Sequence, residues 1–303
     1  MRLDRWVRPL LALLLLATLL LATVGCAREA DPNKGRIVHR EKSMYRDIIV
    51  LDTDTHRCMS FARRGGMQSC IYTDAPDQLA IPYTRAVFAG LMANPDARRV
   101  LVIGLGGGVI PAAMRRIDPD LRIDVVELDP AVVAVAKRYF GFREDPGLHT
   151  FIGDGRVFVR RQARAGIRYD LIVIDAYERV YVPEHLMTRE FIGEVKSLLA
   201  PHGVVASNTF ARGPLAPYEA ATYQSVFDDT RTVEMSMGNR IILAGRDGLP
   251  TADTLRENAT RQQMKLLAVG IFAPELESQP QPRIAGYRPL TDQYSPANLL
   301  FGE

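Results

Sequence analysis

The chain has 303 residues, of which 47% are hydrophobic and 24% are charged, and its formal net charge is +3. This length can bury one large hydrophobic core. The fractions are those of an ordinary globular protein and exclude a disordered or fibrous one. The small net charge excludes the strongly basic surface that nucleic-acid binding requires, so we expect no nucleic-acid partner.

Residues 1–26 are predicted to be a targeting segment. Three arginines in the first eight residues precede an uncharged run over 9–25, which ends at Cys26. The run is short for a membrane span of about 20 residues and suits a signal peptide. Because residues 22–26 resemble a bacterial lipobox, in which the cysteine is acylated, we expect a membrane-attached lipoprotein of the bacterial envelope. An uncleaved anchor helix facing the cytoplasm and ordinary secretion are the alternatives.

Residues 27–44 are polar and are expected to tether a small β-subdomain over residues 45–78. Alternating apolar residues and turn signals predict three strands there, over 47–51, 57–62 and 67–72. Cys58 and Cys70 would lie nearly opposite each other across the second turn, within disulfide range. An oxidising compartment would close this bridge, and two buried free thiols are the alternative.

Strands and helices alternate over residues 79–245, beginning with a helix over 79–93. Strands are predicted over 100–104, 122–128, 150–153, 171–175 and 204–210, with helices near 109–117, 130–140, 155–165, 185–199 and 217–228. This alternation predicts an α/β fold with a doubly wound, Rossmann-like parallel sheet and helices on both faces.

Two further segments, over 231–237 and 240–244, are predicted to form a terminal antiparallel hairpin. Such a hairpin is typical of methyltransferase-type folds and not of dinucleotide dehydrogenases. Residues 246–303 are expected to add one helix, over 251–268, and a tail that packs back over the surface.

A glycine-rich loop follows the strand predicted over 100–104, with glycines at Gly104, Gly106, Gly107 and Gly108. Such glycines let the backbone approach a ligand and present amide groups to it, and a plain tight turn is the alternative. The spacing does not match Gly-x-Gly-x-x-Gly, because Val109 stands at the final glycine position, and no lysine follows as in a phosphate-binding loop. We therefore expect a nucleoside without a pyrophosphate.

Acidic residues end the next three strands. Glu127 can accept hydrogen bonds from both hydroxyls of a ribose, and a solvated strand-end acid is the alternative. Asp154, followed by Gly155, can accept one from an adenine amine, and a helix N-cap is the alternative. Asp175 faces the crevice where ligands of such sheets bind. It is a candidate general base or amine ligand and is also expected to contact the cofactor, with Glu178 as a second charge and a plain turn residue as the alternative.

Together these segments resemble the spermidine synthase family, the polyamine aminopropyltransferases. The resemblance covers residues 45–245 and rests mainly on the segments at 100–104, 126–129, 153–156 and 169–175. It implies S-adenosylmethionine or its decarboxylated form as co-substrate, no metal, and an amine such as putrescine as acceptor of an aminopropyl group. It also implies that Gln68 contacts the cofactor, that Tyr83 lies near the acceptor amine, and that Asp175 helps to deprotonate this amine. A homodimer is left open.

Some positions depart from the family's pattern. Gly107 stands where the family has an aspartate that binds the donor's amine, and Glu178 replaces a second aspartate. Beyond Tyr83, Arg85 and Ala89 stand where an acid and a histidine are expected. Arg85 should repel a cationic acceptor, by about 1–4 kcal/mol at ~4 Å. Two alternatives therefore remain: a methyltransferase, for which Gly107 leaves room for the methionine carboxylate, and a non-catalytic envelope protein that retains the nucleoside pocket.

Overall fold

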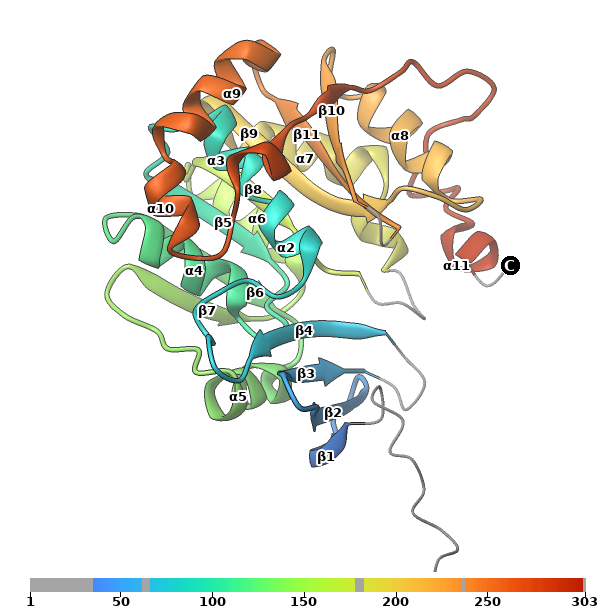
Figure 1. Cartoon of the computed structure of the whole chain (residues 1–303). Coiled ribbons are helices and arrows are strands. Elements are labelled where there is room, and N and C mark those ends of the chain that lie inside the picture. The colour runs from blue at the N-terminus through green and yellow to red at the C-terminus, as the bar shows by residue number, and fades with distance from the viewer. Residues whose placement is uncertain (1–34, 62–65, 178–182, 236–237, 302–303) are drawn as a thin grey trace, which may run out of the picture. The chain divides into compact units, whose positions relative to one another are not determined.

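Two β-sheets and their covering helices make up residues 36–303, the second of the chain's two units, the first being residues 1–35. A computed structural model describes residues 35–61, 66–177, 183–235 and 238–301 (Figure 1). The predicted targeting segment, with Cys26, and the predicted second charge, Glu178, lie outside the described residues.

The N-terminal sheet is antiparallel and has its strands in chain order. They are β1 (Arg36–Lys42), β2 (Asp47–Asp52), β3 (His56–Ser60) and β4 (Met67–Tyr72). The strands over 47–72 match the prediction, but β1 falls in the segment expected to be a tether. That expectation is wrong because β1 pairs along its length with β2, and Val38 packs against the core of this sheet.

A disulfide joins Cys58 of β3 to Cys70 of β4, where the two residues stand directly opposite each other. Both cysteines are buried. The structure thus contains the bridged form of the two alternatives. The bridge ties down β4 beside Ser69 and two residues from Gln68, which lines the pocket described below.

The main sheet has eight strands in the order β12-β10-β11-β9-β8-β5-β6-β7. Their bounds are β5 (Arg99–Ile103), β6 (Arg122–Glu127), β7 (Leu148–Ile152), β8 (Tyr169–Ile174), β9 (Leu199–Phe210), β10 (Thr230–Glu234), β11 (Asn239–Gly245) and β12 (Gln279–Pro280). Strands β5 to β9 pair in parallel, and β10, β11 and β12 add antiparallel pairs at one edge. The predicted α/β sheet with a terminal antiparallel hairpin is confirmed.

Helices cover both faces of the main sheet (Figure 1). One face carries α2 (Pro82–Ala86), α3 (Ala89–Ala93), α4 (Val109–Ile117), α9 (Ala252–Arg261) and α10 (Gln263–Leu267). The other carries α6 (Gly155–Arg164), α7 (Arg189–Leu198) and α8 (Ala216–Gln224). Alternate residues of β5 enter the two cores, Val100 on one side and Leu101 on the other. This is why its sequence is continuously apolar.

The helix predicted over 79–93 is divided into α2 and α3. Between them the backbone makes hydrogen bonds to the third preceding residue, as from Phe88 to Arg85 and from Leu91 to Phe88. A tight turn of this 3₁₀ type separates the two helices. The remaining elements are α5 (Pro130–Tyr139), η1 (Glu184–Leu186), η2 (Ala273–Leu276) and α11 (Ala297–Phe301).

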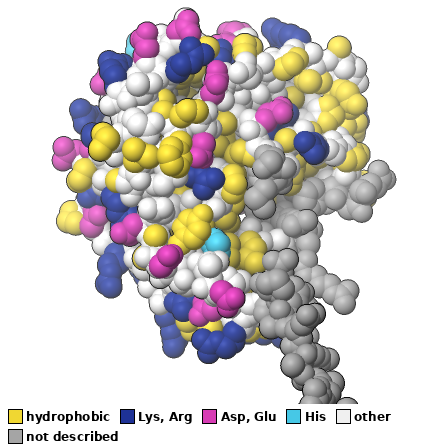
Figure 2. All heavy atoms as spheres, viewed as in Figure 1, with side chains coloured by type: hydrophobic (Ala, Val, Ile, Leu, Met, Phe, Trp, Pro, Cys, Tyr) yellow, Lys and Arg dark blue, Asp and Glu magenta, His cyan; other side chains and the backbone are white. Residues whose placement is uncertain are grey.

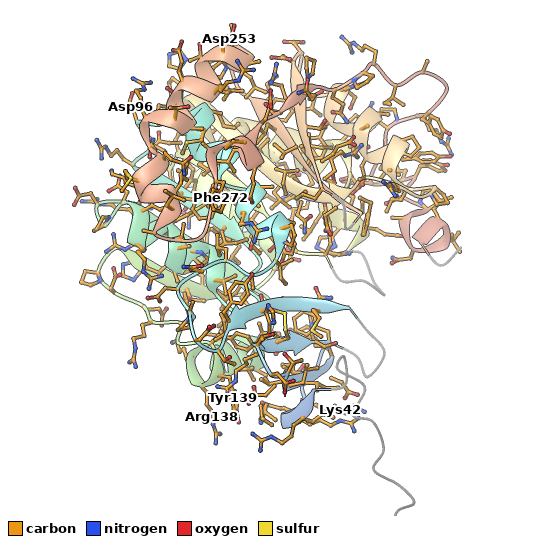
Figure 3. All side chains as sticks on the ribbon, in the orientation of Figure 1. Lys42, Asp96, Arg138, Tyr139, Asp253 and Phe272 are labelled. Carbon is orange, nitrogen blue, oxygen red and sulfur yellow. A yellow bond between two sulfur atoms is a disulfide. The ribbon has the colours of Figure 1, made fainter. Side chains whose placement is uncertain are left out.

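Helix α5 connects the two sheets. Its Val132 and Val135 belong to the core of the N-terminal sheet, and its Val133 belongs to a core of the main sheet. Tyr139, at the end of α5, lies beside the N-terminal sheet (Figure 3), where its ring stacks on His39 at 4.9 Å between centroids. The N-terminal sheet is thereby held next to the strand ends at which a ligand would bind.

Acidic and basic side chains are interspersed over the face seen in Figure 2, in keeping with the net charge of +3. No helix within the described residues combines the length and the hydropathy needed to cross a membrane.

Candidate active site

A pocket open to solvent lies at the carboxyl ends of the parallel strands. Its walls come from the loops after β5, β6, β7 and β8, from the N-terminal sheet, from α2 and from η1. Eight of the predicted site residues line it: Gln68, Tyr83, Gly104, Gly106, Glu127, Asp154, Gly155 and Asp175. This is the edge at which ligands of open α/β sheets bind.

Glu127 is held by the backbone. Its Oε2 accepts a hydrogen bond from the amide of Leu105, and its Oε1 accepts one from the amide of Asp129, both at 2.9 Å. The side chain is only 7% exposed, and this burial raises the pKa of its carboxyl. The two amides fix the orientation of the carboxylate and leave further lone pairs for a ligand.

The glycine loop contributes only its first half to the pocket. Gly104 has a φ of +95°, and a Cβ there would lie 2.1 Å from the carbonyl oxygen of Asp175. Only glycine fits that approach of two strand ends. Gly106 also lines the pocket, whereas Gly107 and Gly108 do not.

Gly107 is held away from the pocket by the N-terminal sheet. Its amide donates to Oγ of Ser69 at 2.9 Å. A Cβ on Gly107 would lie 2.9 Å from Cβ of Ser69 and 3.0 Å from Cδ1 of Phe140. No side chain fits here without movement of these neighbours, and the amide is not free to meet a ligand. Gly108 is instead the N-cap of α4.

Asp154 has two roles in the structure. Its Oδ1 accepts from the amide of Val157 at 2.9 Å and so caps α6, which was the alternative considered from the sequence. Its Oδ2 lies 2.7 Å from Nε2 of His185. Both Asp154 and His185 line the pocket. The sequence did not identify His185, because it reaches Asp154 from a segment 31 residues further along the chain.

Asp175 has a perturbed pKa. Burial raises the pKa of its carboxyl to about 6, opposed by hydrogen bonds from Asn208 and Tyr83 and aided by the charge of Glu127. Nδ2 of Asn208 donates to Oδ1 at 2.9 Å, and the Tyr83 hydroxyl lies 3.3 Å from Oδ2. A carboxylate with this pKa can accept a proton near neutral pH.

Tyr83 and Asn208 are themselves positioned. The Tyr83 hydroxyl lies 3.0 Å from the carbonyl oxygen of Gln68 in β4. The carboxylate of Asp175 is its second hydrogen-bond partner. Oδ1 of Asn208 accepts a hydrogen bond from Nδ2 of Asn239 at 3.0 Å. This bond orients the amide so that Nδ2 of Asn208 points toward Asp175. Asn208 was not identified from the sequence, although an amide near the end of a strand of apolar residues could have drawn attention to it.

The expected repulsion by Arg85 is wrong. Nε of Arg85 lies 2.6 Å from Oε2 of Glu275 in η2, and a second nitrogen donates to the carbonyl of Leu79. The guanidinium is thus neutralised by a residue 190 positions away, and Arg85 does not line the pocket. Ala89 is buried in the core, on α3.

The arrangement suits a nucleoside with a reaction at one end. From the sequence we expect Asp154 at the base, Glu127 at the ribose and Asp175 at the reacting group. In the structure His185 lies beside Asp154, and Asp175 has a perturbed pKa. Within the described residues, no group of three or more histidine, cysteine, aspartate or glutamate side chains is placed to bind a metal ion.

Comparisons with known proteins identify relatives of this chain. Residues 83–230 match the family model described as the spermine/spermidine synthase domain. A polyamine aminopropyltransferase from Vibrio vulnificus is 41% identical over 277 residues, which are 87% of this chain and 91% of that protein. Putrescine N-methyltransferase 1 from Nicotiana tabacum is 30% identical over 177 residues, 57% of this chain and 45% of that protein.

The fold is shared with solved structures. A probable spermidine synthase from Corynebacterium glutamicum superposes with a TM-score of 0.66 at 21% identity, covering 85% of this chain and 97% of that one. The similarity to the Vibrio vulnificus protein extends over nearly the whole of both chains. The chain therefore belongs to the spermine/spermidine synthase family.

Proposed function

We propose that the protein transfers an aminopropyl group from decarboxylated S-adenosylmethionine to a small amine such as putrescine. The observation that carries the proposal is Asp175, a half-buried residue whose carboxyl has a pKa of about 6 and lies in the pocket at the strand ends. The 41% identical relative is named for this activity. Because the pKa of Asp175 lies below 7, this carboxyl is mostly ionised at neutral pH and can attract and deprotonate an amine.

The donor would be held by groups that the pocket already orients. The free lone pairs of Glu127 would accept both ribose hydroxyls, since its two backbone partners fix the carboxylate. Asp154 and His185 would meet the edge of the adenine. The backbone at Gly104 and Gly106, which line the pocket, would face the sulfur end.

In the proposed reaction, the amine nitrogen attacks the methylene carbon of the aminopropyl group that is bonded to sulfur. The C–S bond breaks as the N–C bond forms, and its electron pair stays on sulfur, giving the neutral thioether methylthioadenosine. The proton leaves the attacking nitrogen for Asp175, whose oxygens are kept in place by Asn208 and Tyr83. Catalysis would therefore come from alignment of the two substrates and from proton removal.

Methyl transfer from S-adenosylmethionine is the second candidate. One observation favours it: the glycine loop offers no carboxylate to the donor's free amine, because Ser69 and Phe140 fill the space next to Gly107. The relative from Nicotiana tabacum is named as a putrescine N-methyltransferase. Against it, the Gly107 amide already binds Ser69 and is not available to a methionine carboxylate.

Calorimetry with the two donors side by side separates these candidates. We expect decarboxylated S-adenosylmethionine to bind at least about tenfold more tightly than S-adenosylmethionine, which corresponds to about 1.4 kcal/mol. Tighter binding of S-adenosylmethionine would favour methyl transfer. Binding of neither would overturn both candidates and leave the non-catalytic alternative.

We also propose that the protein is attached to the bacterial membrane by acylation of Cys26. The apolar run over 9–25 supports this proposal, as does the Cys58–Cys70 disulfide, because disulfides persist in oxidising compartments. A Cys26→Ala variant should lose the acyl mass and leave the membrane fraction. An unchanged mass would contradict lipidation. The homodimer remains a proposal that sedimentation of the purified protein tests.

A further inference from the structure

We infer that the C-terminal segment 290–298 completes the base side of the nucleoside site. Asp292 is its positioning residue and acts through Arg156. The inference rests on the proposed binding of an adenine nucleoside in the pocket. None of residues 290–298 lines the pocket, and the family match ends at residue 230.

Arg156 lies in the first turn of α6, next to Gly155 in the pocket wall, and is only 7% exposed. Its guanidinium donates to both carboxylate oxygens of Asp292, at 2.7 and 2.8 Å, and to Glu194 at 2.8 Å. Asp292 also accepts from the Thr188 hydroxyl at 2.7 Å. A two-point contact of this kind fixes orientation as well as distance.

The guanidinium of Arg156 also contacts the segment that carries His185, which pairs with Asp154. One of its nitrogens donates to the carbonyl oxygen of His185 at 3.3 Å, and Nε2 of His185 lies 2.7 Å from Oδ2 of Asp154. Arg156 therefore links the start of α6, which carries Asp154, to the segment that carries His185. Asp292 holds the guanidinium in the position that makes this link.

The tail holds the same segment at two further points. The amide of Asn298 donates to Oε1 of Glu184 at 3.0 Å, and the carbonyl of Leu290 accepts from the amide of Arg189 at 2.8 Å. Leu290 and Ala297 are fully buried, in one cluster with Met187. The apolar contacts anchor the tail, so the polar ones can set the position of residues 184–189.

Loss of the Asp292 charge should affect binding of the base and not the chemical step. A buried guanidinium that loses one of two anionic partners shifts toward the other, here Glu194 on α7. The carbonyl of His185 then loses its donor, and the Asp154–His185 pair is no longer held to the fraction of an ångström that recognition needs. Asp175 and Tyr83 belong to other elements and are not moved.

The test measures binding of 5′-methylthioadenosine by calorimetry, with the full chain. Asp292→Asn should weaken binding about tenfold, the loss typical when supporting partners of a site are removed. Asp292→Glu keeps the charge and should retain most of the affinity. The matched control is Asp253→Asn, on α9 (Figure 3), which also pairs with an arginine but has an 82% exposed side chain. It should bind like the wild type.

The inosine counterpart of the probe, which lacks the 6-amino group, gives the deciding readout. Asp292→Asn should reduce the wild-type preference for the adenosine probe, and the kcat at saturating donor should be unchanged. If Asp292→Asn lowers only the unfolding temperature and leaves this preference intact, the role is merely structural and the inference is overturned.

Hydrogen exchange on the wild type tests the same claim without a variant. Binding of the probe should slow exchange of the amides of Leu290 and Asp292, which bond to Thr222 and Glu190 outside the pocket. Unchanged exchange in the tail of the liganded protein would overturn the inference alone. A wild type that does not bind the probe would overturn the proposed function together with it.

Discussion

The proposed ribose and base side of the site and its proposed reacting side are held by different means. On the first side, Glu127 and Asp154 end neighbouring strands and accept hydrogen bonds from backbone amides. On the second side, Asp175 is held by the side chains of Tyr83 and Asn208, which lie 92 and 33 residues away in the chain. Backbone amides survive substitution of their side chains, whereas side-chain partners do not. The position of Asp175 should therefore be more sensitive to substitution of its partners than the position of Glu127.

The substitution Asp175→Asn should have the largest effect. It removes the proton acceptor while keeping the shape and the hydrogen bond to Tyr83. We expect kcat to fall by about 10²–10⁴, the usual contribution of a general base. Donor affinity, measured by calorimetry, should stay within about twofold, because the proposed contacts to the nucleoside come from Glu127, Asp154 and His185. An unchanged kcat would remove Asp175 from the mechanism.

Glu127→Gln should give the opposite pattern. The charged acceptor for both ribose hydroxyls is lost, and each charge-assisted hydrogen bond contributes about 1.5–3 kcal/mol. We expect the Kd of the donor to rise about 100-fold and kcat at saturating donor to stay within a few-fold. If kcat falls as strongly as for Asp175→Asn, the two sides of the site do not act separately.

The glycine loop offers a test by stability. Gly107→Asp should destabilise the protein by about 1–3 kcal/mol, as overpacking does, because its Cβ would overlap Ser69 and Phe140. Adding Ser69→Gly should recover part of this loss. Gly193→Asp is the control, since a Cβ at Gly193 meets nothing within 4 Å. Urea denaturation measures all three, and a Gly107→Asp protein as stable as the control would refute the packing argument.

The pH dependence should show the smallest effect. Because the pKa of Asp175 is about 6, kcat/KM should fall as the pH drops through 6 and the carboxylate becomes protonated. Asn208 donates to the charged form and lowers this pKa. Asn208→Ala should therefore move the acid limb up by about one pH unit, or about 1.4 kcal/mol. If kcat/KM falls at the same pH in the wild type and in Asn208→Ala, a group other than Asp175 determines the acid limb of the profile.

The sequence predicted the parts of the molecule that depend on neighbouring residues. The apolar strands β5 to β8, the glycine at 104 and the acids Glu127, Asp154 and Asp175 all follow from short patterns. It missed the partners that come from far along the chain, namely His185, Asn208 and Glu275. The expectation for Arg85 failed for the same reason, because Glu275 neutralises it from 190 residues away.

Strand β1 illustrates a second limit. Its sequence is polar, and only its pairing with β2 and the packing of Val38 make it a strand. The position of Gly107 likewise could not be derived from the loop itself. Ser69, from the other sheet, takes up its amide and its free space. Tertiary contacts decided both cases.

Mass spectrometry of the reaction products tests the central claim most directly. The purified protein is incubated with putrescine and with either decarboxylated S-adenosylmethionine or S-adenosylmethionine, and Asp175→Asn serves as the control. We predict an aminopropylated amine and methylthioadenosine, in a one-to-one ratio, with the decarboxylated donor only. A methylated amine formed from S-adenosylmethionine, or no product from either donor, would contradict the account.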